Sequence, residues 1–172
     1  MNNEGTEASV RLRQTVDGWE RRLRSMDESA TMVRPAPWKW SPREIIGHLI
    51  DSASNNHGRF VRAAWQDNLV FPGYRQTDWV ALQDYQSCSW SHLVTLWAAY
   101  NRHLAHVMAA IPEDVRFRSH AKHNLDEIAW RTVPRSEPVT LDYFMHDYVG
   151  HLEHHLRQVL PPEVVSAPRE SH

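Results

Sequence analysis

The chain has 172 residues, with 12 histidines against one cysteine, and its 19 Lys and Arg nearly balance its 21 Asp and Glu. This length predicts one domain over residues 1–165, with a polar, disordered tail at 166–172. The balanced charge argues against nucleic acid or an anionic membrane as a partner, and the lone Cys88 excludes any multi-cysteine metal site. With no apolar targeting segment and no run of the roughly 18 apolar residues that a membrane helix needs, we expect a cytoplasmic protein that does not bind membranes.

Two amphipathic helices are predicted in the first third of the chain. Apolar residues recur at spacings of three and four between Leu12 and Met26, with arginines on the other faces, which predicts a helix with a solvated basic side. A capping box follows at Ser41 and Glu44, with Pro42 at the first helical position. It predicts that a second long helix runs over about residues 42–66.

Three more helices are predicted further along the chain. Residues 77–85 indicate a short helix, and an apolar stripe that starts near Ser89 and is ended by Pro112 predicts a third long one. The last long helix covers about residues 140–160, where Pro161 and Pro162 end it.

Residues 112–139 carry no helical stripe, so we expect a long connection there, with a small hairpin around residues 127–133. Four long amphipathic helices predict an all-α fold, specifically an antiparallel four-helix bundle with this long connection before the last helix.

The positions of the histidines on these helices favour a metal site. His151 and His155 lie four residues apart at the border of the apolar face of the last helix, so both imidazoles can meet one ion. On the second helix, His48 begins a polar row that continues through Ser52, Asn55 and Arg59, which would suit a lined pocket between helices. Three histidines from facing helices would leave open positions on the metal, as in catalytic sites. Histidines with ordinary polar contacts at a helix border would give the same spacing.

These residues resemble a known family, the DinB-like superfamily, and in particular its YfiT-like branch of metal-dependent hydrolases. The resemblance covers about residues 36–160 and rests on Trp40-Ser41-x-x-Glu44-x-x-Gly47-His48-Leu49-x-Asp51-Ser52, Asn55, Arg59-Phe60, Pro72-x-Tyr74, Trp79, Leu82 and His151-x-x-x-His155-Leu156. It implies a four-helix bundle, often a homodimer, with one divalent ion such as zinc, nickel or manganese held by His48, His151 and His155. Gln158 departs from the pattern, since this branch often has a further histidine there.

The resemblance also implies an activity. Relatives include S-transferases that use low-molecular-weight thiols such as bacillithiol or mycothiol, and members with no established reaction. We therefore expect a transferase of a thiol to an electrophile, or a hydrolase, acting on a small molecule. A divalent ion lowers the pKa of bound water to about 7 and binds a thiol as thiolate. The alternative is a non-catalytic metal or small-molecule binding module.

Several other residues are candidates for supporting roles. Asn55 and Arg59 could bind an anionic or carbonyl group of the substrate, since the Arg59 fork suits a carboxylate. Asp51 and Glu44 could accept a proton from the second nitrogen of a ligand histidine. Seven other histidines are expected to face solvent or lie in loops, namely His57, His92, His106, His120, His123, His146 and His154. His103 lies at the core border of its helix and could form a hydrogen bond within the bundle.

Overall fold

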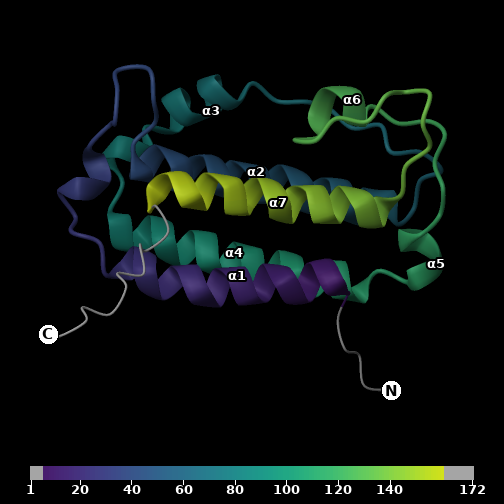
Figure 1. Cartoon of the computed structure of the whole chain (residues 1–172), viewed down its shortest axis with the longest axis horizontal. Coiled ribbons are helices and arrows are strands. Elements are labelled where there is room, and N and C mark those ends of the chain that lie inside the picture. The colour runs from purple at the N-terminus through teal and green to yellow at the C-terminus, as the bar shows by residue number, and fades with distance from the viewer. Residues whose placement is uncertain (1–5, 161–172) are drawn as a thin grey trace, which may run out of the picture.

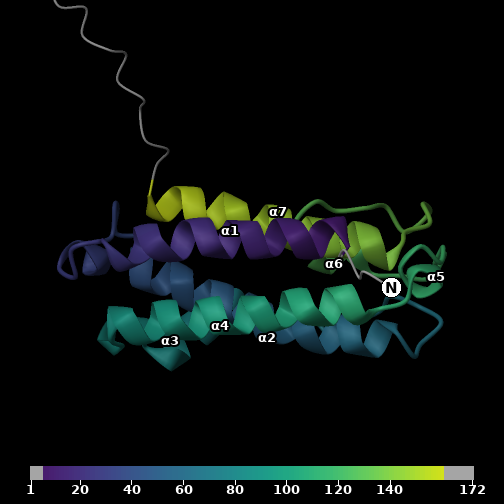
Figure 2. The same ribbon diagram turned by 90° about the horizontal axis from the view of Figure 1, so that it is seen from below.

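The computed structural model describes residues 6–160 and contains a bundle of four long helices (Figure 1). These are α1 (Glu7–Arg24), α2 (Pro42–Ala63), α4 (Trp90–Ala110) and α7 (Leu141–Val159). α1 packs on α4 and α7, and α2 packs on the same two helices, so α1 and α2 lie diagonally across the bundle. Figure 2 shows α1 and α7 on one side and α2 and α4 on the other. The predicted all-α four-helix bundle is confirmed.

A return connection sets the direction of α4. After α2, residues 64–75 run back along the bundle to α3 (Gln76–Gln83), and the turn η2 (Tyr85–Ser87) leads into α4 (Figure 1). Asp84 adopts the left-handed φ of 43° between α3 and η2. α4 therefore runs parallel to α2, whereas α1 and α7 run the opposite way. The two helices with the candidate metal ligands, α2 and α7, are antiparallel neighbours.

Side-chain caps begin the long helices where the sequence predicts them. The Ser41 hydroxyl accepts from the Glu44 amide at 3.3 Å, and the Glu44 carboxylate accepts from the Ser41 amide at 2.8 Å, so the capping box is confirmed. Thr140 caps α7 in the same way by accepting from the amide of Tyr143. α2 ends three residues before the predicted position 66, because the chain turns back there to bury Leu69.

Residues 112–139 hold two short helices, α5 (Glu113–Arg116) and α6 (Leu125–Ile128). The hairpin predicted around residues 127–133 is wrong: between residues 6 and 160 there are only isolated bridges, Leu69 with His123 and His120 with Val139. The amides of Trp130 and Arg131 donate instead to the Asp147 carboxylate on α7, at 2.9 and 2.8 Å. A strand partner is therefore not needed to satisfy them.

His120 and His123 lie in this connection, which fits the expected loop position, but they are buried, with 3% and 5% exposure, and do not face solvent. His120 lies within hydrogen-bonding distance of the Asp67 carbonyl, and His123 of the Glu137 carbonyl at 2.8 Å. Their role in the structure is to join the long connection to its neighbours.

The core lies between the four long helices and includes three fully buried large aromatic residues, Phe60, Trp97 and Phe144. Tyr85 closes one side of it by packing its ring directly on Gly47 of α2. A Cβ atom at Gly47 would lie 2.0 Å from the ring, so this position needs a glycine. None of the helices in the described part of the chain is both long and apolar enough to span a membrane.

Candidate metal site

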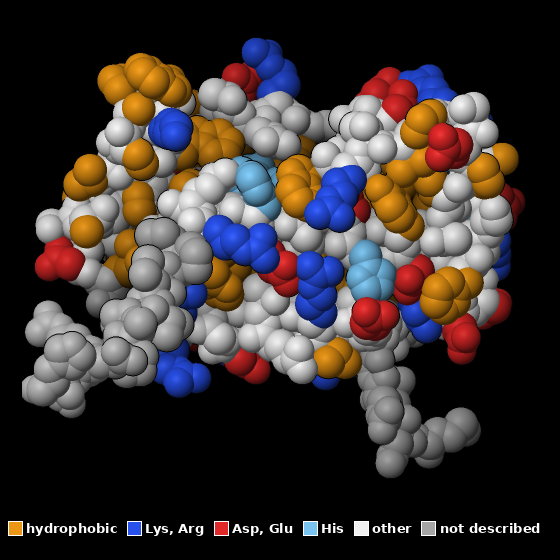
Figure 3. Space-filling view, in the orientation of Figure 1, with side chains coloured by type: hydrophobic (Ala, Val, Ile, Leu, Met, Phe, Trp, Pro, Cys, Tyr) orange, Lys and Arg blue, Asp and Glu red, His pale blue; other side chains and the backbone are white. Residues whose placement is uncertain are grey.

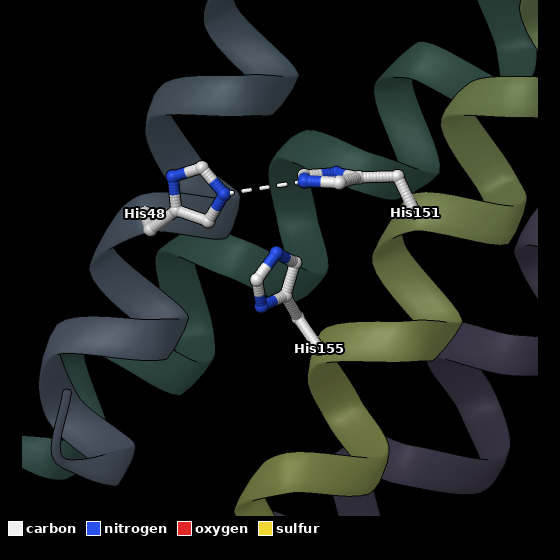
Figure 4. Close-up of side chains that lie close together, drawn as sticks. All are labelled: His48, His151 and His155. Carbon is white, nitrogen blue, oxygen red and sulfur yellow. Dashed lines mark hydrogen bonds between the residues drawn. The ribbon is translucent and has the colours of Figure 1, made fainter. Parts of the chain in front are cut away.

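Three histidines converge between α2 and α7 (Figure 4). One ring nitrogen from each of His48, His151 and His155 lies within 4.8 Å of the other two. The Nε2 atoms of His48 and His151 are 3.3 Å apart, and the His155 ring packs edge-on against both other rings. Among residues 6–160, no other group of three His, Cys, Asp or Glu side chains is this close together.

The helices position these side chains in a simple way. His151 and His155 are one turn apart on α7 and therefore project in the same direction. His48 faces them from α2 and is completely buried, with the Trp40 ring packed against it at a centroid distance of 5.0 Å. The site thus forms where the two antiparallel helices meet.

Burial keeps the three imidazoles neutral. Burial, together with the nearby imidazoles, lowers the pKa of His48 to about 3 and that of His151 to about 2. Burial also lowers the pKa of His155. Neutral imidazole is the form that binds a metal ion, so all three lone pairs are available near pH 7.

The spacing of one pair of nitrogens fits a divalent ion, and the third nitrogen lies within 4.8 Å of both. Two imidazole nitrogens bound at about 2.0–2.1 Å in tetrahedral geometry lie about 3.3–3.4 Å apart, and the Nε2 atoms of His48 and His151 are 3.3 Å apart. Gln158 fixes the third ligand, since its side-chain oxygen lies 3.1 Å from Nδ1 of His155. An amide oxygen only accepts, so Nδ1 carries the proton and Nε2 keeps its lone pair.

The two carboxylates expected to support the ligands do not do so. Glu44 completes the capping box and pairs with Arg34. Asp51 accepts from the Tyr85 hydroxyl and from the Gln83 amide, both at 2.7 Å. Nδ1 of His48 is buried and has no hydrogen-bond partner among the described residues. In this structure Gln158 supplies the contact to a ligand imidazole that we expected from a carboxylate.

A cavity of about 320 Å³ opens beside His151 and His155. One wall comes from α2 and another from α7, and the connections between helices supply the rest. The lining residues are Ser52, Asn56, Arg59, Tyr74, Gln76, Glu127, Ile128, Ala129, Trp130, Phe144, Asp147, Tyr148, His151, His154 and His155.

Only one of the two candidate substrate residues lines this cavity. Arg59 lines the cavity, is only 5% exposed, and donates to the side-chain oxygen of Asn56 and to the Pro72 carbonyl. Asn55 lies outside it, in a neighbouring hollow that Arg59 and Trp79 also line, and donates to the backbone of its own helix. The return connection covers the edge of α2 that carries Asn55. Asn56, and not Asn55, therefore lines the cavity.

A second hollow, of about 620 Å³ and mostly apolar, is lined by different residues from the cavity and lies next to His48 and His155. Its lining includes Trp38 and Trp40 from the loop before α2, together with Gln158 of α7. Trp40 contacts His48, and Gln158 contacts His155, so this hollow reaches two of the three histidines through one residue each. Figure 3 shows hydrophobic side chains gathered over this loop, at the upper left.

The sequence pattern of the DinB superfamily matches residues 11–159. The chain belongs to the DinB superfamily. Its structure is similar to that of YfiT from Bacillus subtilis, which is described as a probable metal-dependent hydrolase with an unusual four-helix bundle topology. The two share 17% sequence identity with a TM-score of 0.72, over 92% of this chain and 85% of YfiT. No curated protein matches the chain significantly.

Some cavity residues of this DinB-superfamily chain are not evident from its sequence. Glu127 and Trp130 come from the long connection, which has no periodicity that could indicate which side chains turn inward. Asp147 lies on α7, but its role depends on the distant amides that it binds. Tyr74 could have been found, since Pro72-x-Tyr74 is part of the family resemblance.

Proposed function

We propose that this protein is a divalent-metal-dependent enzyme that acts on a small molecule, with the ion held by His48, His151 and His155. The observation that carries the proposal is the convergence of three neutral imidazoles beside a cavity. Three protein ligands leave coordination positions for substrate, as catalytic sites require. Zinc, nickel and manganese are the candidate ions.

The residues around the ligands have distinct roles in this proposal. When bound, the ion would supply a Lewis acid that activates a water or a thiol for attack. Gln158 holds the His155 ring in the tautomer that binds metal, and Trp40 shields His48 from solvent. The cavity beside His151 would hold the substrate and align it with the ion.

Between the two activities, we favour transfer of a low-molecular-weight thiol to an electrophile. Such a reaction needs room for two substrates, whereas hydrolysis needs room for one substrate and a water. A polar cavity beyond His151 and an apolar hollow beyond Trp40, with the histidines between them, support the two-substrate reaction. Hydrolysis is the second candidate activity and is supported by the similarity to YfiT.

Metal analysis tests the site directly. We expect purified protein to carry about one divalent ion per chain, and His48→Ala, His151→Ala and His155→Ala to lose it. The control is His92→Ala, since His92 lies on exposed α4 surface away from the site. Full metal content in all three site variants would contradict the proposal.

Activity assays separate the candidate reactions. Metal-loaded protein is incubated with monochlorobimane and, in turn, cysteine, bacillithiol or mycothiol, and separately with a nitrophenyl ester. Thiol conjugation that the histidine variants lack would support the transferase, and ester cleavage alone would support the hydrolase. If the metal stabilises the fold but no turnover occurs with any substrate, the protein is instead the non-catalytic binding module.

We also propose a homodimer in the cytoplasm. The family resemblance supports the dimer, and a single cysteine, Cys88, is consistent with a reducing compartment. Sedimentation of purified protein across a concentration range measures the oligomeric state, and a monomer at all concentrations would contradict the dimer.

A further inference from the structure

Arg59 is a buried cation without an anionic partner. The side chain is 5% exposed, and its two hydrogen bonds go to neutral oxygens, those of the Asn56 amide at 3.3 Å and the Pro72 carbonyl at 2.9 Å. No ion pair to Arg59 is found among residues 6–160. Burying a charge without an opposite charge costs free energy, so this arrangement needs a compensating role.

The acids that line the same cavity form no ion pair with Arg59. Asp147 accepts the amides of Trp130 and Arg131, and Glu127 is paired with Arg135. Burial lowers the pKa of Arg59, and the other groups that affect it are Tyr74 and Arg62 rather than a carboxylate. The guanidinium therefore faces the cavity without a carboxylate at ion-pair distance among the described residues.

Other polar groups stand beside the guanidinium. Ser52 and Asn56 lie on the same wall of the cavity, and Tyr74 closes it from the return connection. Burial raises the pKa of Tyr74 to about 12, so its hydroxyl keeps its proton and can donate. A ligand group held here would meet a charged fork and at least one neutral donor.

The guanidinium lies within reach of the histidines. It sits 6.0 Å from the ring of Phe144, which is seven residues before His151 on α7. At 1.5 Å per residue, this separation is about 10 Å along the helix. A small molecule can span that distance, with one end on Arg59 and the other at the ion.

We propose that Arg59 binds a carboxylate of the substrate. The enzyme then acts on small molecules that carry a carboxylate about 10 Å from the reacting atom. This inference rests on the proposed function for the identity of the reacting end, but the carboxylate site itself does not depend on the ion. A guanidinium binds a carboxylate through two parallel hydrogen bonds, which lysine cannot reproduce.

Binding to metal-free protein tests the site separately from the metal chemistry. Chelator-treated protein is titrated with hexanoate and with its neutral analogue hexanamide, by calorimetry. We expect hexanoate to bind at least about tenfold more tightly than hexanamide, because only hexanoate can form a hydrogen-bonded charge pair with Arg59. Arg59→Gln, which can still donate to the Pro72 carbonyl, should abolish this preference. Arg62→Gln, on the exposed side of the same helix, is the matched control and should retain it.

The outcomes are distinct. Equal binding of the acid and the amide to the wild type, or an unchanged preference in Arg59→Gln, would overturn the inference. If Arg59→Gln does not fold, Arg59→Lys decides the question: it keeps the charge but loses the fork, so the preference should fall severalfold, and an undiminished preference would overturn the inference. Hexanoate binding that appears only with metal would place the carboxylate on the ion, again contrary to the inference. Loss of metal binding in the histidine variants is a separate readout and affects only the proposed function.

Discussion

His48 and His151 show how burial changes the chemistry of single residues. In water an imidazole is half-protonated near pH 6.5, whereas in the folded protein burial lowers the pKa of these two to about 3 and about 2. The folded chain therefore binds fewer protons than the unfolded chain at any pH between those values and 6.5. By linkage, the free energy of unfolding must fall as the pH drops through this range.

This leads to a prediction for the metal-free protein. Between pH 7 and pH 5, each of the two histidines should reduce the free energy of unfolding by roughly 2 kcal/mol. Urea denaturation of chelator-treated protein at both pH values measures the change. In the double variant with His48→Gln and His151→Gln, the loss on acidification should be smaller by the contribution of both residues. Equal losses in the wild type and the variant would show that these imidazoles are not held neutral.

The sequence predicts single residues well only where helix geometry alone decides their position. The spacing of His151 and His155 on one helix predicts that they point the same way. The polar row on the second helix indicates His48, and the family resemblance implies the same residue. The choice between Asn55 and Asn56 could not be made in this way, because it depends on which edge of α2 the return connection covers. No property of a helix predicts where a distant loop will lie.

Among the structural elements, α2 is constrained by the ring that packs on it. Tyr85 lies against Gly47, and its hydroxyl donates to Asp51 one turn further along the helix. Alanine would normally stabilise a helix relative to glycine, by about 1 kcal/mol. At position 47, however, its Cβ would overlap the Tyr85 ring and break this contact.

Gly47→Ala should therefore lower the free energy of unfolding by about 1–3 kcal/mol, which is the usual cost of forcing an extra methyl group into a packed core. Gly18→Ala is the matched control, because nothing lies within 4 Å of an added Cβ on this exposed part of α1. The control should stabilise the protein, by up to about 1 kcal/mol. Urea denaturation of both variants measures the difference, and a stabilised Gly47→Ala would mean that the Tyr85 ring moves without cost.

The long helices could be predicted because apolar periodicity and caps are local signals. The connections could not, because contacts with other segments shape them. Asn124 illustrates this, since its side chain donates to the Phe71 carbonyl and accepts from the Phe71 amide, as a strand partner would. A side chain that takes the place of a strand partner leaves no alternating pattern in the sequence. The predicted hairpin was wrong because the Asp147 side chain, and not a second strand, accepts the amides of Trp130 and Arg131.

At the scale of the whole molecule, an ion at the three histidines would cross-link α2 to α7. Such an ion would bind the folded chain, where the three histidines are together, and not the unfolded chain. At a free zinc concentration of 100 times the dissociation constant, we expect stabilisation by about 2.7 kcal/mol, which raises the melting temperature by about 5–10 °C.

Thermal melting of chelator-treated protein with and without added zinc measures this shift. His155→Ala serves as the control, because it removes one ligand from the cross-link and should show little or no shift. A shift of the same size in His155→Ala would locate the stabilising ion elsewhere.

The two halves of the site are far apart in the chain, with His48 and His151 separated by 103 residues. Closing so long a loop is slow and entropically costly, so the ligand set assembles only when α7 docks on α2. During synthesis α7 leaves the ribosome after α1, α2 and α4, and a growing chain that has already formed α2 cannot yet capture an ion at this site. The uptake of metal would then mark the docking of α7 on α2, and its rate would report how quickly these two helices come together.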